Sequence, residues 1–349
     1  MVTSPSGHPD VTGRLATRRA GLVLDQVVAA CHEIDYPVED ARPRAVALDT
    51  GIGVIHFTAR PAELGIRIAA DSPANAFMLR ESVLARIEAL DPALVPAVAW
   101  SAPLPGPGLP PNFRVGRVLA VTAPCPSFRR VEISAPDLAP FARDGLHLRL
   151  ALPPAGRRPV WPGIDAAGRT RWPGGPDALH IAVYTIRRVD PAAGTMTVDA
   201  FHHGRGATCA WIDAARPGDP LGLVGPGGGW YPRAPHLTLA GDETALPAIA
   251  RILDAAAPGT TGTALVEVDD AGAAPPIQAP PGIALRLLSR ARGECLEDDL
   301  AGLDLGPAGG RHVWFAAEKA RAQAMRRHLR AERGLQSAES TVAGYWVDR

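Results

Sequence analysis

The chain has 349 residues, of which 46% are hydrophobic and 21% charged, and this composition is typical of a soluble globular protein with two or three domains. Its 36 basic and 36 acidic residues cancel, so no nucleic-acid partner is expected. The cysteines are far apart in the sequence, which argues against a zinc or iron–sulfur site and against a disulfide framework. They are Cys31, Cys125, Cys209 and Cys295.

Hydropathy gives no reason to expect a membrane partner. No apolar run approaches the length that a membrane-spanning helix needs. Residues 1–10 are polar and contain Pro, Gly and Ser, which is not the pattern of a signal peptide. We therefore expect a cytoplasmic protein.

Residues 11–95 are expected to form a small α+β domain. Apolar residues recur at helical spacing in Arg18–Ile34 and in Ser72–Leu90, where Ser72 is a candidate N-cap. Between these helices lie three short β-type runs: Ala45–Leu48, Gly53–Thr58 and Gly65–Ala70. Residues 96–112 include A-P-L-P-G-P-G-L-P-P, whose proline and glycine disfavour both helix and sheet, so this segment is expected to be a linker.

Residues 113–235 have the pattern of an antiparallel β-barrel. Alternating or β-branched runs are separated by turn signals. These runs are Val115–Thr122, Arg129–Ile133, Leu146–Leu150, His180–Ile186 and Thr195–Phe201. A long loop at residues 156–175 contains Trp161 and Trp172, and two interpretations of it remain open: a solvated lid that packs the tryptophans, or a cover for a ligand.

Residues 236–349 alternate between strand and helix patterns. Short buried strands are expected at Leu237–Ala240, Ala264–Val268, Ala284–Leu288, Val313–Ala316 and Thr341–Val347. The clearest helices are Ala245–Ala256 and Glu318–Arg333. This alternation predicts a parallel α/β domain with ligands at the carboxyl ends of its strands. Neither G-x-G-x-x-G nor G-x-x-x-x-G-K occurs, so the usual dinucleotide fingerprint is absent.

One stretch of the barrel combines features with which some barrels hold a flavin. Tyr184 and Thr185 lie at the end of a predicted strand, and H-H-G-R-G-A-T-C-A-W follows as a small-residue bend into a helix. An aromatic ring can cover the flavin, a hydroxyl can reach a ring nitrogen, and free helix N–H groups can receive phosphates.

From about Phe113 to Trp346 the chain resembles the siderophore-interacting proteins, which are flavin-dependent ferric-siderophore reductases of the ferredoxin-NADP reductase-like superfamily. Ordered motifs carry the resemblance: P-C-P-S-F-R-R-V-E-I, H-L-R-L-A-L-P, Y-T-I-R-R-V-D, H-G-R-G-A-T-C-A-W, P-G-D-P-L-G-L-V-G-P-G-G, A-G-D-E-T-A-L-P-A-I-A-R-I-L, L-V-E-V-D-D, W-F-A-A-E-K and G-Y-W. Residues 11–95 resemble, more weakly, a small domain fused in front of some of these proteins.

The resemblance implies an FAD-binding barrel at 113–235 and an NAD(P)H-binding α/β domain at 236–349. Electrons would pass from NAD(P)H or ferredoxin through FAD to a ferric siderophore or another small molecule. Tyr184 and Thr185 are the expected catalytic residues at the flavin ring. The other expected cofactor-binding residues are His202, His203, Gly204, Gly206, Ala207, Thr208, Cys209, Gly225, Gly227, Asp242, Glu243, Thr244, Arg290, Glu318, Tyr345 and Trp346.

The sequence departs from the family pattern at cofactor positions. Ala182 replaces the arginine that grips the FAD pyrophosphate, and His180, two residues earlier on the same face, is a partial substitute. Cys209 replaces a phosphate-facing serine, Ala317 a glycine, and Val347 a basic residue. Two interpretations remain open: a flavoprotein that has drifted but still works, or a protein with a lost or remodelled FAD site that binds siderophores or metabolites or serves secondary metabolism.

Several charged positions in the α/β domain have two interpretations. Asp242 and Glu243 suit ribose hydroxyls better than phosphates, and Thr244 is equally an N-cap. Arg290 either meets a 2′-phosphate or is solvated. A basic surface is expected either to attract an anionic ferric siderophore or to be simply an exposed helix face. Its residues are Arg311, Arg326, Arg327 and Arg330.

Overall fold

The computed structural model describes residues 10–33, 40–42, 44–103, 106–143, 145–227, 231–270 and 274–348. The first nine residues, where we expect no signal peptide, lie outside this set, as does the side chain of His32. The chain divides into two compact units, one of residues 1–114 with 156–179 and the other of residues 115–155 with 180–349.

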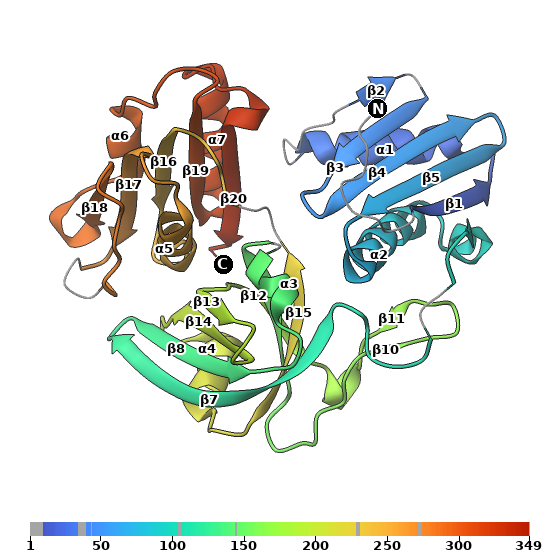
Figure 1. The fold of residues 1–349 in the computed structure, drawn as a ribbon, viewed down its shortest axis with the longest axis horizontal. Helices are drawn as coiled ribbons and strands as arrows, with labels where there is room; N and C mark the ends of the chain where they lie inside the picture. The colour runs from blue at the N-terminus through green and yellow to red at the C-terminus, as the bar shows by residue number, and fades with distance from the viewer. Residues whose placement is uncertain are drawn as a thin grey trace. The chain divides into compact units, whose positions relative to one another are not determined.

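The first unit is built on a six-stranded sheet with the strand order β2-β3-β4-β5-β1-β6, whose neighbouring strands are antiparallel. Helices α1 and α2 pack against its central strands (Figure 1). Alternation in β4 and β5 places Ile55, Phe57, Leu64, Ile66 and Ile68 in the core that the helices cover. The elements are β1 (Val11–Ala16), α1 (Ala20–Glu33), β2 (Asp40–Arg42), β3 (Ala45–Asp49), β4 (Gly53–Arg60), β5 (Glu63–Ala70), α2 (Pro73–Leu90), the 3-10 helix η1 (Pro92–Ala97) and β6 (Ala99–Trp100).

Residues 156–179 leave the barrel sequence and belong to this first unit, which differs from the expected placement as a barrel loop. They contain the hairpin β10 (Gly163–Ile164) and β11 (Thr170–Arg171) and the short η2 (Gly175–Asp177). Arg169 binds Glu81 and Glu88 of α2, and buried Arg80 donates to the carbonyl of Gly168. These contacts to α2 are the physical reason for the difference.

The two tryptophans of this excursion pack against one ring. Phe113 lies 5.7 Å from Trp161 and 6.2 Å from Trp172, measured between ring centroids. The packing interpretation of the two tryptophans therefore has direct support. The segment expected to be a linker, residues 96–112, contains a short strand near its start, because β6 pairs with β1.

The barrel of the second unit is a seven-stranded sheet with the order β12-β9-β15-β7-β8-β14-β13. Its core is formed by inward residues such as Val131, Ile133, Leu148, Leu150 and Leu223. The elements are β7 (Phe113–Cys125), β8 (Phe128–Ser134), α3 (Ala139–Arg143), β9 (His147–Leu152), β12 (His180–Thr185), β13 (Arg188–Asp190), β14 (Thr195–Phe201), α4 (Gly206–Ala214) and β15 (Pro220–Gly227).

The last part of the second unit is a parallel five-stranded sheet with the order β18-β17-β16-β19-β20, as predicted. Helix α5 packs on one face, and α6 and α7 pack on the other (Figure 1). The elements are β16 (His236–Gly241), α5 (Leu246–Ala255), β17 (Thr261–Val268), β18 (Ile283–Ser289), η4 (Arg290–Arg292), α6 (Leu296–Ala301), β19 (Arg311–Glu318), α7 (Lys319–Ala331), η5 (Ser337–Glu339) and β20 (Ser340–Trp346).

The expected fold class, an α+β domain, an antiparallel barrel and a parallel α/β domain, is confirmed by these three sheets. Ser72 caps α2 as predicted, accepting a hydrogen bond from the amide of Asn75. None of the described helices is both long and apolar enough to cross a membrane.

Candidate functional site

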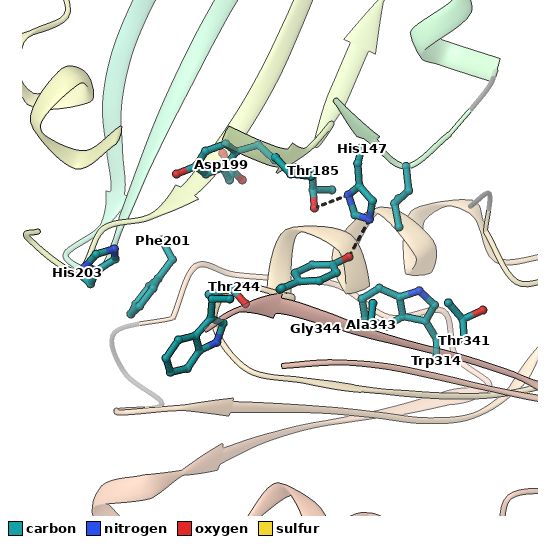
Figure 2. Close-up of a pocket in the computed structure, with 15 residues that line it drawn as sticks. His147, Thr185, Asp199, Phe201, His203, Thr244, Trp314, Thr341, Ala343 and Gly344 are labelled. Carbon is teal, nitrogen blue, oxygen red and sulfur yellow. Dashed lines mark hydrogen bonds between the residues drawn. The ribbon is translucent and has the colours of Figure 1, made fainter. Parts of the chain in front are cut away.

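A cavity of about 460 Å³ opens in the second unit, between barrel strands and strands of the parallel sheet. The barrel contributes residues of β9, β12 and β14, and the parallel sheet contributes β19 and β20 (Figure 2). The lining residues are Leu146, His147, Val183, Tyr184, Thr185, Asp199, Phe201, His203, Thr244, Trp314, Thr341, Ala343, Gly344, Tyr345 and Trp346. Five of the 15 lining residues are Tyr, Phe or Trp, and polar groups converge beside them, as in many small-molecule sites.

Strand β12 brings Tyr184 and Thr185 to the cavity from opposite faces of the strand. Tyr184 lies across from Leu148 and packs against the barrel core, while Thr185 lies across from His147. Burial raises the pKa of the Tyr184 phenol, and a hydrogen bond with Thr208 opposes this shift. Tyr184 is therefore a neutral phenol at pH 7.

His147 connects the barrel to the parallel sheet across the cavity. Its Nδ1 lies 3.4 Å from Thr185 Oγ1, and its Nε2 lies 2.9 Å from the phenol oxygen of Tyr345 (Figure 2). Burial and the positive charge of Arg251 lower the pKa of His147 to about 4. Burial, followed by the nearby charge of Asp242, raises the pKa of Tyr345 well above its ordinary value. Both side chains are therefore neutral at physiological pH.

Asp199 is the carboxylate on the barrel side of the lining, and Arg130 neutralises it. Arg130 Nε and Nη2 each lie 2.7 Å from one oxygen of Asp199, a bidentate pair between β8 and β14. Asp199 is 4% exposed, and the hydrogen bonds that Arg130 donates to it raise the pKa of Arg130. The pair fixes the wall of the cavity beside Phe201 and contributes little net charge to it.

The first turn of α4 is open to a ligand. Its N-cap, Arg205, makes no side-chain cap bond, so the first amide groups of the helix have no such partner. A Cβ added at Gly204 would meet no atom within 4 Å, and at Gly206 only the ring of His203 at 3.9 Å. Both glycines have positive φ, which their lack of a side chain permits. The bend therefore has the free amides and the space that a phosphate needs.

Thr208 stands beside the strand position that lacks an arginine. Its Oγ1 lies 2.9 Å from Nε2 of His180, and it also hydrogen-bonds Tyr184. His180, Ala182 and Tyr184 share one face of β12, so Thr208 joins the residues on both sides of Ala182. Cys209, by contrast, is 4% exposed and does not line the cavity.

Asp242 follows β16 and holds two residues of the cavity lining, Thr244 and Trp346. It accepts hydrogen bonds from the amide and hydroxyl of Thr244 at 2.9 and 2.5 Å. Its other oxygen accepts the indole N–H of Trp346 at 2.7 Å. Thr244 therefore faces the cavity as a hydroxyl already bonded to a carboxylate, and Trp346 is held in place by the same group.

Arg290 and Glu243 form an ion pair with each other, and neither lines the cavity. Arg290 donates to Glu243, to Glu267 at 3.0 Å and to Asp269 at 2.6 Å. Although burial disfavours its charge, these hydrogen bonds raise the pKa of Arg290. A 2′-phosphate would have to compete with three carboxylates for Arg290, and the phosphate interpretation of this residue stays a prediction.

The remaining expected residues lie outside the cavity lining. His202 Nε2 lies 2.9 Å from Asp213, and Glu318 caps α7 by accepting the amides of Ala320 and Arg321. Gly225 and Gly227 lie on β15, and Gly227 pairs with His147. Ala207 lies in the first turn of α4.

The expected basic surface is largely engaged in the fold. Arg326 and Arg330 donate to backbone carbonyls, and Arg311 binds Glu339. Because carbonyls are neutral, Arg326 and Arg330 keep their positive charge, whereas Arg311 is paired with a carboxylate, and both interpretations of this surface stay open.

Sequence reasoning missed nine lining residues as site candidates: Leu146, His147, Val183, Asp199, Phe201, Trp314, Thr341, Ala343 and Gly344. Several lie in motifs quoted above, such as H-L-R-L-A-L-P for His147 and G-Y-W for Gly344. Strand pairing was the absent information, because it alone places His147 opposite Thr185.

Comparisons with known proteins show which family has this architecture. Residues 117–230 match the model of the siderophore-interacting FAD-binding domain, and residues 234–349 match that of the siderophore-interacting protein. An uncharacterised protein of Mycobacterium tuberculosis is 34% identical over 187 residues, 48% of this chain and 64% of that protein. Ferric vibriobactin reductase ViuB of Vibrio cholerae is 31% identical over 150 residues, 40% of this chain and 53% of that protein.

A solved structure of a siderophore utilization protein from T. fusca has the same fold. It superposes with a TM-score of 0.56 at 30% identity, covering 70% of this chain and 95% of that one. The alignments with the curated relatives span less than two thirds of those proteins. The two adjoining family matches, the barrel and the parallel sheet lead to one conclusion: residues 117–349 of this chain belong to the siderophore-interacting protein family.

Proposed function

We propose that the chain is an FAD-dependent oxidoreductase that reduces ferric siderophores, with electrons from NAD(P)H or ferredoxin. One observation carries the proposal. Tyr184 and Thr185, the residues that the family resemblance assigns to the flavin ring, line one cavity with Tyr345 and Trp346 from the end of the parallel sheet. A redox cofactor in this cavity would lie where the barrel meets the strand ends that bind nucleotides in α/β folds.

The residues present fit both ends of FAD, the flavin ring and the diphosphate. Aromatic side chains line the cavity and suit a planar ring, while the open start of α4 suits the diphosphate. Tyr184, Thr185 and Tyr345 would hold the ring end, and His203, beside Gly206, would lie nearer the phosphate end. The amides after Gly206, with Thr208 and His180 nearby, would hold the phosphate end.

Bound FAD would supply the redox chemistry, accepting an electron pair and passing electrons on one at a time. The chain's own residues bind and orient it, and the apolar lining excludes water from it. The substrate chemistry is consistent with this arrangement, since siderophore oxygens are hard ligands that suit Fe(III). Adding one electron weakens the complex and lets softer ligands compete for the iron.

A second candidate function rests on Ala182. Without an arginine at this position, one charge-assisted hydrogen bond to the pyrophosphate is absent, which corresponds to roughly 1.5–3 kcal/mol. If that loss abolishes FAD binding, the cavity would serve a family member that binds siderophores or other metabolites without redox chemistry.

The decisive experiment is a titration of the purified chain with FAD, followed by absorbance and flavin fluorescence. The proposal expects a yellow protein or saturable uptake, and loss of affinity in Tyr184→Ser. Ile181→Ala, on the same strand but outside the cavity lining, is the matched control. A colourless chain that takes up no FAD would overturn the proposal.

A second assay separates iron reduction from other flavin chemistry. The loaded protein is mixed with a ferric siderophore and either NADH, NADPH or reduced ferredoxin, and Fe(II) is trapped with ferrozine. Formation of the coloured Fe(II) complex with one of these donors supports the proposal. A loaded flavoprotein that produces none with any of them would contradict siderophore reduction.

A further inference from the structure

Three side chains form a continuous hydrogen-bonded chain along the cavity. It runs from Tyr345 on β20 through His147 on β9 to Thr185 on β12, with spacings of 2.9 and 3.4 Å. Each of the three lines the cavity (Figure 2). Neutral imidazole has one N–H and one bare nitrogen, so the chain has a direction that depends on which nitrogen is protonated.

The partners of Tyr345 determine this direction. Its phenol is a neutral O–H, and among the described residues His147 Nε2 is the hydrogen-bond partner found for it. If Nε2 carried the proton, it would donate to the phenol, and the O–H would lose the acceptor found for it among the described residues, which is costly. The favoured arrangement has the phenol donating to bare Nε2.

The same reasoning extends to Thr185. With Nε2 bare, the proton of His147 lies on Nδ1, which donates to Thr185 Oγ1. Thr185 is 5% exposed, and within the described part of the chain His147 is the partner found for its hydroxyl. The hydroxyl therefore keeps its own hydrogen available for an acceptor in the cavity.

We infer that His147, held as the Nδ1–H tautomer by Tyr345, orients the Thr185 hydroxyl as a hydrogen-bond donor toward the ligand in this cavity. His147 is then a positioning residue that acts through Thr185. The cavity presents a donor at this point, and it selects ligands with an acceptor there.

The inference deepens the proposed function and rests on it for the identity of the ligand. The central ring nitrogen of an oxidised flavin is an acceptor, whereas in the reduced flavin the same nitrogen carries hydrogen and donates. A hydroxyl held as a donor therefore stabilises the oxidised form and lowers the reduction potential. Releasing the hydroxyl removes this preference.

The first test needs no flavin. Nitrogen-15 NMR of the ligand-free, histidine-labelled chain at pH 7 distinguishes the two tautomers and the protonated ring, and His147 is assigned by its loss in His147→Asn. We expect Nδ1–H for His147, and a mixture of tautomers in Tyr345→Phe. Trp346→Phe, the next residue on β20, is the control and should leave the tautomer unchanged, because its indole bonds Asp242.

The second test measures the reduction potential of bound FAD. His147→Leu should raise it, by ~30 mV if the donor favours the oxidised form tenfold in a two-electron couple. Tyr345→Phe should also raise it, but by less, because a mixture of tautomers keeps part of the Nδ1–H population. His147→Asn, whose amide occupies a position near Nδ1 and can still donate, should stay near the wild-type value. The double variant of His147→Leu and Tyr345→Phe should equal His147→Leu alone, because Tyr345 acts only through His147.

The outcomes distinguish a failure of the proposed function from a failure of the inference about His147. Failure of FAD uptake would overturn the proposed function, and the NMR result would still decide the tautomer. An Nε2–H or doubly protonated His147 in the ligand-free chain would overturn the inference itself. An Nδ1–H tautomer with unchanged potentials in Tyr345→Phe and His147→Leu would overturn the orientation of Thr185 toward the flavin.

Discussion

Arg290 Nη1 lies 3.0 Å from Oε1 of Glu267, which joins the end of β18 to the end of β17. The same carboxylate oxygen also lies 2.9 Å from Arg321 Nη1. Glu267 is 3% exposed, and although burial opposes its ionisation, hydrogen bonds from Arg321 and Arg290 lower its pKa. The carboxyl edge of the parallel sheet is therefore held together by an interlocked set of ions.

Removing the charge of Arg290 should destabilise the second unit. Arg290→Met leaves buried Glu243 without its cation, while Glu267 keeps Arg321. We expect a loss of roughly 2–3 kcal/mol, below the range for a pair left with no cation. Urea unfolding at pH 7 measures it. Arg292→Met, which breaks an exposed pair with Glu294, is the control and should cost no more than about 0.5 kcal/mol. Equal losses in both variants would contradict a structural role for the cluster.

The ion pairs between Arg169 and α2 should be unequal in strength. Arg169 Nε lies 3.0 Å from Glu81, whose side chain is 21% exposed, and its Nη2 lies 3.2 Å from the half-exposed Glu88. Glu81 also accepts the amide of Thr170, so it fixes the excursion twice.

Double-mutant cycles that combine Arg169→Met with Glu81→Gln or with Glu88→Gln test this. We expect a coupling of about 1 kcal/mol for the Glu81 pair and a few tenths for the Glu88 pair. Limited proteolysis should cut residues 156–179 faster in Glu81→Gln than in Glu88→Gln. The opposite order would show that the excursion is held by other contacts.

The buried His147 makes stability depend on pH. Its pKa is about 4 in the folded chain, against an ordinary 6.5, so the unfolded chain binds more protons between these values. The stabilisation is therefore complete above pH 6.5 and is lost as the pH falls toward 4, by at most about 3 kcal/mol.

Urea unfolding at pH 7 and at pH 4.5 measures this contribution. Other groups also titrate in this range, so the comparison is between the wild type and His147→Leu. We expect the wild type to lose more stability on acidification than the variant does. Identical losses would mean that the pKa of His147 is not lowered in the folded chain.

The sequence anticipates the sheets better than the site. Period-two alternation in Thr195–Phe201 and the polar cap at Ser72 are local signals, and the structure has β14 and the α2 N-cap at those residues. Tyr184 and Thr185 are predicted as site residues from a local sequence motif, and both line the cavity.

The contacts of His147, Asp199 and Arg290 could not be predicted from the sequence, because each depends on residues distant in the chain. His147 meets Tyr345 from 198 residues away, and Arg130 meets Asp199 from 69. Arg290 could be a phosphate ligand or a solvated side chain by sequence alone. Only the parallel register, which sets Ser289 beside Val268, brings it to Glu267.

Restoring an arginine at position 182 should tighten FAD binding. Ala182 lies on the face of β12 that also carries His180 and Tyr184, and both of those side chains hydrogen-bond Thr208 of α4. A guanidinium placed there would reach the open first turn of this helix, where the free amides lie. One charge-assisted hydrogen bond corresponds to about a tenfold to hundredfold gain in affinity.

Flavin fluorescence titration of Ala182→Arg against the wild type measures this gain. Ile181→Arg adds the same charge one residue earlier, on the opposite face of the strand and outside the cavity lining, so it should leave the affinity unchanged. If both variants tighten binding equally, the effect is a general attraction of an anionic ligand. If Ala182→Arg leaves the affinity for FAD unchanged, the His180–Thr208 pair already supplies the contact that the arginine would make. This pair lies on the same face of β12, beside the start of α4.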